Sequence, residues 1–351
     1  MSAWLTVPSA RAYNTPVSSD SEAITMRSYT KVNLTLDVLG KRPDGFHAIE
    51  SVMQTISLHD TLTLRVGDRQ GIRVTCDMPG IPTGEANLAY KAALLFFESR
   101  GIAPGMDIQI EKRIPPQAGL GGGSSNAAAV LRALSRMLER EGEAPAEPHE
   151  RKEMARESAF AKASADRPLT GELMGLAAGI GSDVPFFLVG GTAFVSGRGE
   201  EVQPLPDIRT WWLVIVKPPF GVSTAWAYQR LDEMRKAVCK RESHSRRILR
   251  YIEAASPLPD LLWNDLELPV IERYPGIGEV KESLLRVGAR GALVCGSGSA
   301  VFGLFDSEDE AHEAVGQLGQ NLGELFLAKT ISREEAIGLP PSPAVGYQGH
   351  G

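Results

Sequence analysis

Residues 115–126 read PPQAGLGGGSSN and run directly into AAAVLRALSRML, so a glycine run ends where a helix is expected to begin. Gly119, Gly121, Gly122 and Gly123 lack a Cβ, which lets the backbone take φ of either sign and approach a ligand closely. The amides of such a run can converge on one anion. The segment therefore predicts a phosphate-binding loop, although a glycine-rich segment taken alone is also typical of a tight turn.

Ser124, Ser125 and Asn126 are expected to open the helix, where unpaired amides and the positive end of the helix dipole favour a phosphate. The loop differs from two common nucleotide-binding patterns. No lysine follows the glycines as in G-x-x-x-x-G-K-S/T, and the spacing is not that of G-x-G-x-x-G after a strand. The nature of the ligand must therefore come from other segments.

Three further motifs accompany the loop: TKVNLTLDVLGKRPDGFHAIESVMQTISLHDTL, GIGSDVPFFLVGGTAFVSGRGE and GARGALVCGSGSAVFGLF. Together, and in this order, they resemble the kinase superfamily that contains galactokinase, homoserine kinase, mevalonate kinase and phosphomevalonate kinase. The resemblance covers roughly residues 26–335. Where most members read G-L-G-S-S-A, this chain reads GLGGGSSNA. That longer run is similar to the branch that acts on a cytidyl-erythritol substrate.

The resemblance implies an α+β, two-domain small-molecule kinase fold. Its N-terminal ATP-binding domain would be of the ribosomal-protein-S5-like type and its C-terminal domain ferredoxin-like. Residues 141–170, rich in Ala, Glu, Lys and Pro, are interpreted as a surface insertion, with a lid over the nucleotide as the alternative. The expected divisions are a disordered extension at 1–25, a catalytic domain at 26–209, a substrate domain at 210–338 and a loose tail at 339–351.

Hydrophobic periodicity supports this organisation. In the first half, apolar alternation predicts strands over 32–38, 62–66 and 106–110, and helical spacing predicts a helix over 86–100. In the second half, the predicted order is a strand over 211–218, a helix over 223–238 capped by Ser223, a helix over 279–287, strands in ALVC and AVFGLF, a helix in DEAHEAVGQL and a strand in LFLAKTI. This order is compatible with a ferredoxin-like layer.

Phosphoryl transfer requires a group that orients the acceptor hydroxyl and a cation that stabilises the transferred charge. Asp183 follows the Gly181-Ser182 turn and precedes an expected strand containing Pro185, a setting also typical of a turn former or cap. The resemblance makes Asp183 the catalytic base and places Lys31 beside it. Without the resemblance, Lys31 and Asn33 would simply form the solvated face of a strand.

The resemblance also assigns the acceptor site. Phe46 and His47 in GFHAIES would stack on and hydrogen-bond the cytosine of the acceptor. A Phe-His pair would otherwise be typical of one core and one surface residue. Asn33 would bind substrate hydroxyls or a phosphate, Tyr228 would cover the other face of the base, and Thr224 would make a polar contact.

Two loops would then hold the nucleotide. Gly296, Ser297 and Gly298 would close the site beside the glycine loop, although a glycine-serine hairpin explains them equally well. Mg²⁺ is expected to accompany ATP; Ser125 is one possible ligand, and no carboxylate is evident. The predicted ATP-binding residues are Pro116, Gly119, Leu120, Gly121, Gly122, Gly123, Ser124, Ser125 and Asn126.

Composition narrows the function class. A net charge of -6 over 351 residues argues against a nucleic-acid binder, although Lys31, Lys41 and Arg42 can attract phosphates. Three widely spaced cysteines suggest neither a zinc site nor a disulfide framework and favour the cytoplasm. No apolar run approaches the roughly 18 residues of a membrane span. We therefore expect a small-molecule substrate, no nucleic-acid or membrane partner, and a monomer or homodimer.

The activity implied by the resemblance is ATP-dependent phosphorylation of the 2-hydroxyl of 4-diphosphocytidyl-2-C-methyl-D-erythritol, in the non-mevalonate route to isoprenoid precursors. Two alternatives remain at this point. One is a kinase of the same superfamily that acts on homoserine or a mevalonate-like alcohol, which Phe46 and His47 argue against. The other is a silent nucleotide-binding module, which Lys31 and Asp183 argue against.

Overall fold

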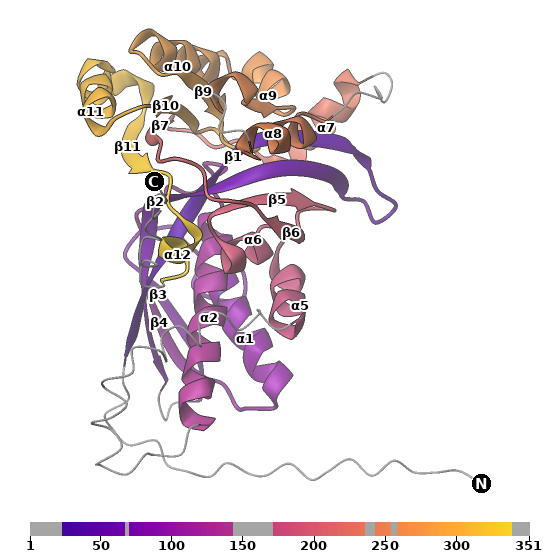
Figure 1. Ribbon diagram of the computed structural model, residues 1–351. Helices are drawn as coiled ribbons and strands as arrows, with labels where there is room; N and C mark the ends of the chain where they lie inside the picture. Colours follow the sequence, from indigo (N-terminus) through magenta and orange to yellow (C-terminus); the bar gives the residue numbers. More distant parts are fainter. Residues whose placement is uncertain (1–22, 67–69, 143–170, 236–242, 254–257, 339–351) are drawn as a thin grey trace, which may run out of the picture.

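The computed structural model describes residues 23–66, 70–142, 171–235, 243–253 and 258–338. These residues form two β-sheets with helices packed against them (Figure 1). The predicted tail, nearly all of the predicted insertion and most of the predicted N-terminal extension lie outside the described residues. The first strand begins at Ile24, just inside the range predicted to be disordered.

The larger sheet has seven described strands in the order β3-β4-β2-β1-β8, with β5 paired to β2 and β6 paired to β5. Strands β1 and β2 form a long antiparallel hairpin that carries Lys31, Asn33, Phe46 and His47. The strands predicted over 32–38, 62–66 and 106–110 lie within β1, β2 and β4 and are confirmed. The bounds are β1 Ile24–Lys41, β2 His47–Val66, β3 Gly71–Cys76, β4 Gly105–Glu111, β5 Thr192–Ser196, β6 Glu201–Pro204 and β8 Trp263–Asn264.

Four helices pack with this sheet around the first core: α1 Leu88–Arg100, α2 Gly122–Gly142, α5 Gly171–Ile180 and α6 Val184–Val189. The side chains of Ala127, Ala128 and Ala129 are fully buried, and their small size lets the start of α2 approach the sheet closely. Helix α1 confirms the helix predicted over 86–100. Its cap Asn87 accepts a hydrogen bond from the amide of Ala89, and Gly101 ends it in the left-handed conformation.

The segment after Asp183 differs from the expected strand. Residues 184–189 form the short helix α6, and Pro185 occupies its first turn. Proline suits that position because its φ is already helical and the amide it lacks would have no partner there. Asp183 therefore stands at the N-terminal end of a helix, although its side chain makes no capping hydrogen bond.

The second sheet contains β7 Trp212–Lys217, β9 Gly291–Val294, β10 Val301–Phe305 and β11 Glu324–Lys329 in the antiparallel order β11-β7-β10-β9. This arrangement confirms the predicted ferredoxin-like layer and the α+β class. Ser223 caps α7, as predicted. The remaining helices of this half are α7 Thr224–Met234, α8 His244–Glu253, α9 Glu267–Arg273, α10 Pro275–Arg286, α11 Glu308–Gln317, α12 Arg333–Ala336 and the 3-10 turns η1 Leu258–Leu261 and η2 Gln320–Leu322.

Elements of the second half also pack on the β1–β2 hairpin. Strand β8 pairs with β1, and helix α8 packs on both strands of the hairpin. The buried carboxylate of Asp37 accepts hydrogen bonds from the amides of His244 and Ser245 and so caps α8 from another part of the chain. The hairpin thus joins the two halves, and the domain boundary at 209/210 stays a prediction.

Candidate active site

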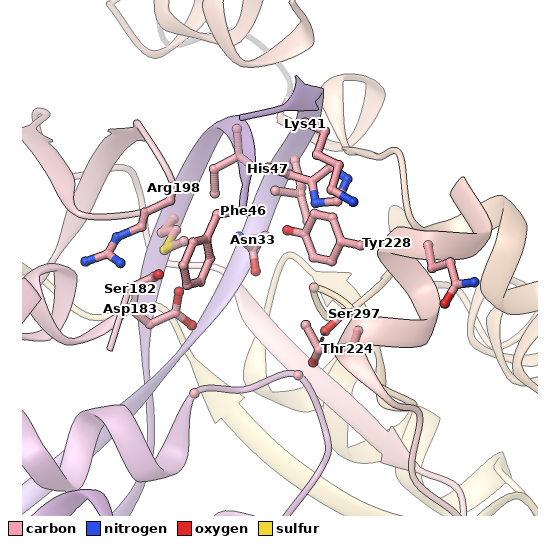
Figure 2. Close-up of a pocket in the computed structure, with 18 of the residues that line it drawn as sticks. Asn33, Lys41, Phe46, His47, Ser182, Asp183, Arg198, Thr224, Tyr228 and Ser297 are labelled. Carbon is pink, nitrogen blue, oxygen red and sulfur yellow. Dashed lines mark hydrogen bonds between the residues drawn. The ribbon is translucent and has the colours of Figure 1, made fainter. Parts of the chain in front are cut away.

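A cavity of about 890 Å³ lies where the β1–β2 hairpin, the glycine loop, the turn before α6 and the start of α7 meet (Figure 2). All seven residues predicted for catalysis and acceptor binding line it. They are Lys31, Asn33, Phe46, His47, Asp183, Thr224 and Tyr228, together with Gly119, Gly121, Gly296 and Ser297 of the two glycine loops.

The predicted catalytic pair is brought together inside this cavity. The ammonium nitrogen of Lys31 lies 3.5 Å from a carboxylate oxygen of Asp183. The same nitrogen donates hydrogen bonds to Asn33 Oδ1 at 2.7 Å and to the carbonyl of Gly119 at 3.2 Å. Lys31 is only 4% exposed, whereas the Asp183 side chain is 31% exposed and open to the cavity. The lysine is thus fixed in place, and the carboxylate is accessible to a ligand.

The amide side chain of Asn33 extends this network. Its nitrogen donates to Ser51 Oγ at 2.8 Å, and Ser51 Oγ donates in turn to the carbonyl of Thr35 at 2.6 Å. These bonds orient Asn33 so that its oxygen faces the ammonium of Lys31. Lys31 and Asn33 lie on one face of β1, as strand alternation predicted.

The two glycine loops interlock above Lys31. Gly119 has a φ of +80°, and a Cβ added there would lie 1.8 Å from the carbonyl oxygen of Cys295. A Cβ on Gly298 would lie 2.2 Å from the amide nitrogen of Gly119. These contacts require glycine at both positions. They also explain why the segment after Cys295 contains glycine: it packs directly against the glycine loop around Gly119.

Gly121 and Gly122 are restricted by their side-chain neighbours. A Cβ on Gly121, whose φ is +72°, would lie 2.9 Å from the ring of Phe187 and 3.3 Å from Cε of Lys31. A Cβ on Gly122 would lie 2.9 Å from Ile114. Gly123 differs, since the nearest neighbour of its added Cβ would be Leu88 at 3.6 Å. The start of α2 therefore keeps its backbone close to the sheet.

Not every residue predicted for ATP binding faces the cavity. The buried Ser125 hydroxyl donates to the carbonyl of Tyr29, and Asn126 accepts a hydrogen bond from Ser28 at 2.8 Å. Both side chains thus tie α2 to β1. The side chain of Leu120 is buried, and the exposed Pro116 lines a separate groove of about 390 Å³. Gly298 lines a cavity of about 550 Å³ that adjoins the first one.

A buried ion pair supports the entrance to the glycine loop. Lys112 Nζ lies 2.6 Å from Asp60 Oδ2, and Asp60 Oδ1 accepts hydrogen bonds from the amides of Arg113 and Ile114 at 2.8 Å. The Asp60 side chain is fully buried. The Lys112 ammonium also lies 3.1 Å from the position of an added Cβ on Gly122. No local sequence pattern indicates this pair, because its members stand far apart in the chain.

The other end of the cavity is aromatic. The ring of Phe46 is 49% exposed, and the rings of His47 and Tyr228 have centroids 4.8 Å apart. In Figure 2, Phe46 and Tyr228 stand on opposite sides of the cavity, and His47 lies next to Tyr228 at the upper edge. Burial raises the pKa of the Tyr228 hydroxyl, so this phenol stays neutral. The Thr224 hydroxyl lies 2.7 Å from that of Ser297 and links α7 to the second glycine loop.

Two charged residues that line the cavity were not predicted as site residues. The guanidinium carbon of Arg198 lies 5.1 Å from the centroid of the Phe46 ring, and its NH2 nitrogen donates to the carbonyl of Ala178 at 2.9 Å. Asp232 contacts His47 Nε2 with both carboxylate oxygens. Helical spacing was a usable signal for Asp232, because it lies one turn after Tyr228 on α7. Lys41, predicted only to attract phosphates, also lines the cavity.

Family models match both halves of the chain. The model described as "GHMP kinases N terminal domain" matches residues 87–191, and "GHMP kinases C terminal" matches residues 234–324. A 4-diphosphocytidyl-2-C-methyl-D-erythritol kinase of Geobacter metallireducens is 41% identical over 294 residues, covering 84% of this chain and 93% of that relative. The chain belongs to this family of GHMP kinases.

Other relatives agree with this assignment. The kinase of the same name from Acetivibrio thermocellus is 36% identical, covering 88% of this chain and 100% of its own length. A crystal structure of 4-(cytidine 5'-diphospho)-2C-methyl-D-erythritol kinase matches with a TM-score of 0.67 at 32% identity, covering 87% of this chain and 98% of that one. Homoserine kinase from Cytophaga hutchinsonii, at 21% identity, shares the fold with a TM-score of 0.62, covering 91% of this chain and 98% of its own.

The family assignment confirms the predicted two-domain kinase fold, and it supports ATP as the phosphoryl donor because GHMP kinases depend on ATP. None of the described helices is both long and apolar enough to cross a membrane. The family matches do not assign roles to the individual site residues. Those roles are inferred from the positions and contacts of the residues in the cavity.

Proposed function

We propose that the protein transfers the γ-phosphoryl group of ATP to the 2-hydroxyl of 4-diphosphocytidyl-2-C-methyl-D-erythritol, giving the 2-phosphate and ADP in the non-mevalonate route to isoprenoid precursors. The observation that carries this proposal is one cavity with the Lys31–Asp183 pair at one end and the Phe46, His47 and Tyr228 rings at the other. The names of the relatives support the choice of substrate.

In this proposal the glycine loop holds the triphosphate. Gly119, Gly121, Gly122 and Gly123 bring backbone amides and the N-terminal end of α2 close to the phosphates, where both favour negative charge. The loop around Gly296 closes over them from the second half of the chain. At the start of α2, the hydroxyl of Ser124 is the one available to the phosphates. The side chains of Ser125 and Asn126 form hydrogen bonds with β1 instead.

Asp183 then acts on the acceptor. Its carboxylate takes the proton of the 2-hydroxyl, whose oxygen attacks the γ-phosphorus in line while the bond to the bridging β,γ-oxygen breaks. The adjacent ammonium of Lys31 stabilises the negative charge on the transferred phosphoryl group. Asn33, fixed by Lys31 and Ser51, offers polar atoms to the substrate beside this pair.

The aromatic end binds the cytidine. Phe46 and Tyr228 provide two ring faces between which a base can stack, and His47 stands at the edge of the same space. Lys41 and Arg198 also line the cavity, and their positive charges would balance the charge of the acceptor diphosphate. Thr224 supplies a polar contact from α7.

Mg²⁺ belongs to the proposal as an ion carried by the triphosphate, which is its usual state in kinases. Among the described residues, no group of three or more His, Cys, Asp or Glu side chains is placed to hold a metal ion. The hydroxyl of Ser125, the one candidate ligand from the sequence, is bound to the carbonyl of Tyr29. The described residues thus do not form a metal cage.

We also propose that the reaction takes place in the cytoplasm. The substrate is a small molecule, the protein has neither a nucleic-acid nor a membrane partner, and it acts as a monomer or homodimer.

Burial raises the pKa of the Cys295 thiol to about 12, so this cysteine beside the active site stays protonated and unreactive.

An ADP-release assay with parallel acceptors tests the function. We expect turnover with the cytidyl-erythritol diphosphate and little with mevalonate or homoserine, because only the first carries a base for the aromatic end. Faster turnover of mevalonate or homoserine would contradict the proposed substrate and indicate the function of another GHMP kinase. Absence of ADP release with all three would contradict the kinase activity of this chain.

A further inference from the structure

Asp232 makes a close contact with His47 that the proposed reaction does not itself require. Both of its carboxylate oxygens lie within hydrogen-bonding distance of His47 Nε2, at 3.0 and 2.9 Å. The His47 side chain is 11% exposed, and that of Asp232 is 39% exposed. Among the described residues, the His47 ring forms hydrogen bonds with Asp232 alone. These involve Nε2, and Nδ1 has no hydrogen-bond partner among the same residues.

Helix α7 holds the His47 ring from two sides. Tyr228 and Asp232 stand one helical turn apart and therefore project from the same face of the helix. Tyr228 packs its ring against that of His47, while Asp232 binds the Nε2 edge. His47 itself comes from the start of β2. The orientation of this ring is thus set by a helix of the other half of the chain.

The partner of Nε2 determines what Nδ1 can do. An ionised carboxylate only accepts hydrogen bonds, so Nε2 must carry the proton. In a neutral imidazole the other nitrogen then has a free lone pair and acts as an acceptor. An acceptor at the edge of the base site can bind the exocyclic amino group of cytosine. Uracil presents a carbonyl oxygen at the same position, and two acceptors cannot form a hydrogen bond.

We propose that Asp232 is a positioning residue for base recognition: it fixes His47 in the Nε2–H tautomer, so that Nδ1 accepts a hydrogen bond from the amino group of cytosine. This inference rests on the proposed function, because it assumes a cytidine in the aromatic end of the cavity. Asp232 does not touch the base, and it contributes to the choice of cytosine over uracil only through His47.

A mutant cycle tests the proposal. The ratio of kcat/KM for the cytidine acceptor to that for its uridine analogue would be measured for the wild type, Asp232→Ala, His47→Ala and the double variant. We expect Asp232→Ala to lower this ratio by about tenfold or more, the range for an unsatisfied buried hydrogen-bonding group, chiefly through the KM of the cytidine acceptor. In the His47→Ala background, Asp232→Ala should change nothing further.

Glu233→Ala is the matched control. It removes one carboxylate from the adjacent position of α7, where Glu233 binds Arg230 and does not contact His47. It should leave the cytidine-to-uridine ratio as in the wild type. An unchanged ratio in Asp232→Ala, or an equal loss in the His47→Ala background, would overturn the role of Asp232. A wild type that does not phosphorylate the cytidine acceptor would instead overturn the proposed function on which that role rests.

The tautomer can also be measured without catalysis. With ¹⁵N-labelled histidine, the two-bond correlations of the His47 ring, assigned through the His47→Ala spectrum, show which nitrogen carries the proton. At pH 8 we expect the Nε2–H form in the wild type and a mixture of tautomers in Asp232→Ala. A doubly protonated or Nδ1–H ring in the wild type at this pH would overturn the proposal.

Discussion

The ammonium nitrogen of Lys31 lies 3.5 Å from the carboxylate of Asp183, although the first residue belongs to β1 and the second precedes α6. Lys31 is held there by hydrogen bonds to Asn33 and to the carbonyl of Gly119. Asp183 makes no capping hydrogen bond and is open to the cavity. The pair thus joins a fixed cation to an accessible carboxylate, and the Gly119 carbonyl of the glycine loop helps to position the cation.

Replacing Asp183 by Asn tests the base. The amide keeps the size of the side chain but cannot take the proton of the acceptor hydroxyl, so we expect kcat to fall by roughly 10² to 10⁴. ATP affinity, measured by calorimetry, should change little, because in the proposed function the glycine loop, and not Asp183, binds the phosphates. Asp309→Asn, at an exposed position in the first turn of α11, is the matched control and should retain wild-type turnover. More than about half the wild-type turnover in Asp183→Asn would contradict the base assignment.

Two glycines of the phosphate loop should respond differently to the same change. Gly119→Ala places a Cβ 1.8 Å from the carbonyl of Cys295 at a positive φ, so the interlocked loops must separate. We expect the melting temperature to fall by several degrees, corresponding to about 1–3 kcal/mol. In Gly123→Ala the new Cβ meets Leu88 at an ordinary 3.6 Å, and the melting temperature should stay near the wild-type value. Equal losses in both variants would show that the interlock is unimportant.

Local patterns in the sequence were sufficient for most of the fold. Apolar alternation located β1 and β4, a continuous apolar run located β7, and the cap residue Ser223 located the start of α7. The segment after Asp183 was predicted as a strand, because a short apolar run with a proline carries no helical period. Its helical state depends on packing against α2 and α5, which is tertiary information.

The site residues that belong to a recognisable sequence motif were predictable, whereas their contacts with residues far away in the chain were not. Lys31, Asp183, Phe46 and His47 line one cavity, as the resemblance implied. The side chains of Ser125 and Asn126 form hydrogen bonds with β1. The first turn of a helix presents its polar side chains on more than one face, and the sequence does not indicate which face binds the ligand. The partners of His47 and Lys112 lie far away in the chain, so only the folded arrangement shows them.

The buried pair of Lys112 and Asp60 should be important for stability. Lys112→Met leaves the fully buried Asp60 carboxylate without its cation, although two backbone amides still bind it. We expect a loss of roughly 3–5 kcal/mol in the free energy of unfolding, measured with urea. Adding Asp60→Asn should recover part of that loss, since it removes the unpaired charge. A double variant less stable than Lys112→Met alone would contradict this explanation.

Asp37 should make the protein sensitive to acid. Burial alone would raise the pKa of its carboxyl, but hydrogen bonds from Ser245 and His244 outweigh burial and hold the pKa below its ordinary value of 3.8. A carboxyl with a lowered folded pKa stabilises the protein above its unfolded pKa, and this stabilisation is lost as the pH falls through the folded pKa. Asp37→Asn should therefore lower the melting temperature at pH 7, by an amount corresponding to about 1.5–3 kcal/mol. The difference from the wild type should shrink below about pH 4, and a constant difference down to pH 3 would contradict this role.

The Phe46 ring provides the final test of the acceptor site. It is 49% exposed, with the guanidinium of Arg198 5.1 Å from its centroid, and in Figure 2 Tyr228 stands across the cavity from it. If cytosine stacks on this ring, Phe46→Ala should weaken acceptor binding by roughly 1–3 kcal/mol, the range for base–aromatic stacking in nucleic-acid complexes. Phe46→Tyr keeps the ring face and should bind the acceptor as the wild type does. The KM for ATP should hardly change in either variant, because the glycine loop, the proposed phosphate site, lies at the other end of the cavity. If Phe46→Ala left the acceptor KM unchanged, the base would have to bind elsewhere, and only a broader small-molecule kinase activity would remain supported.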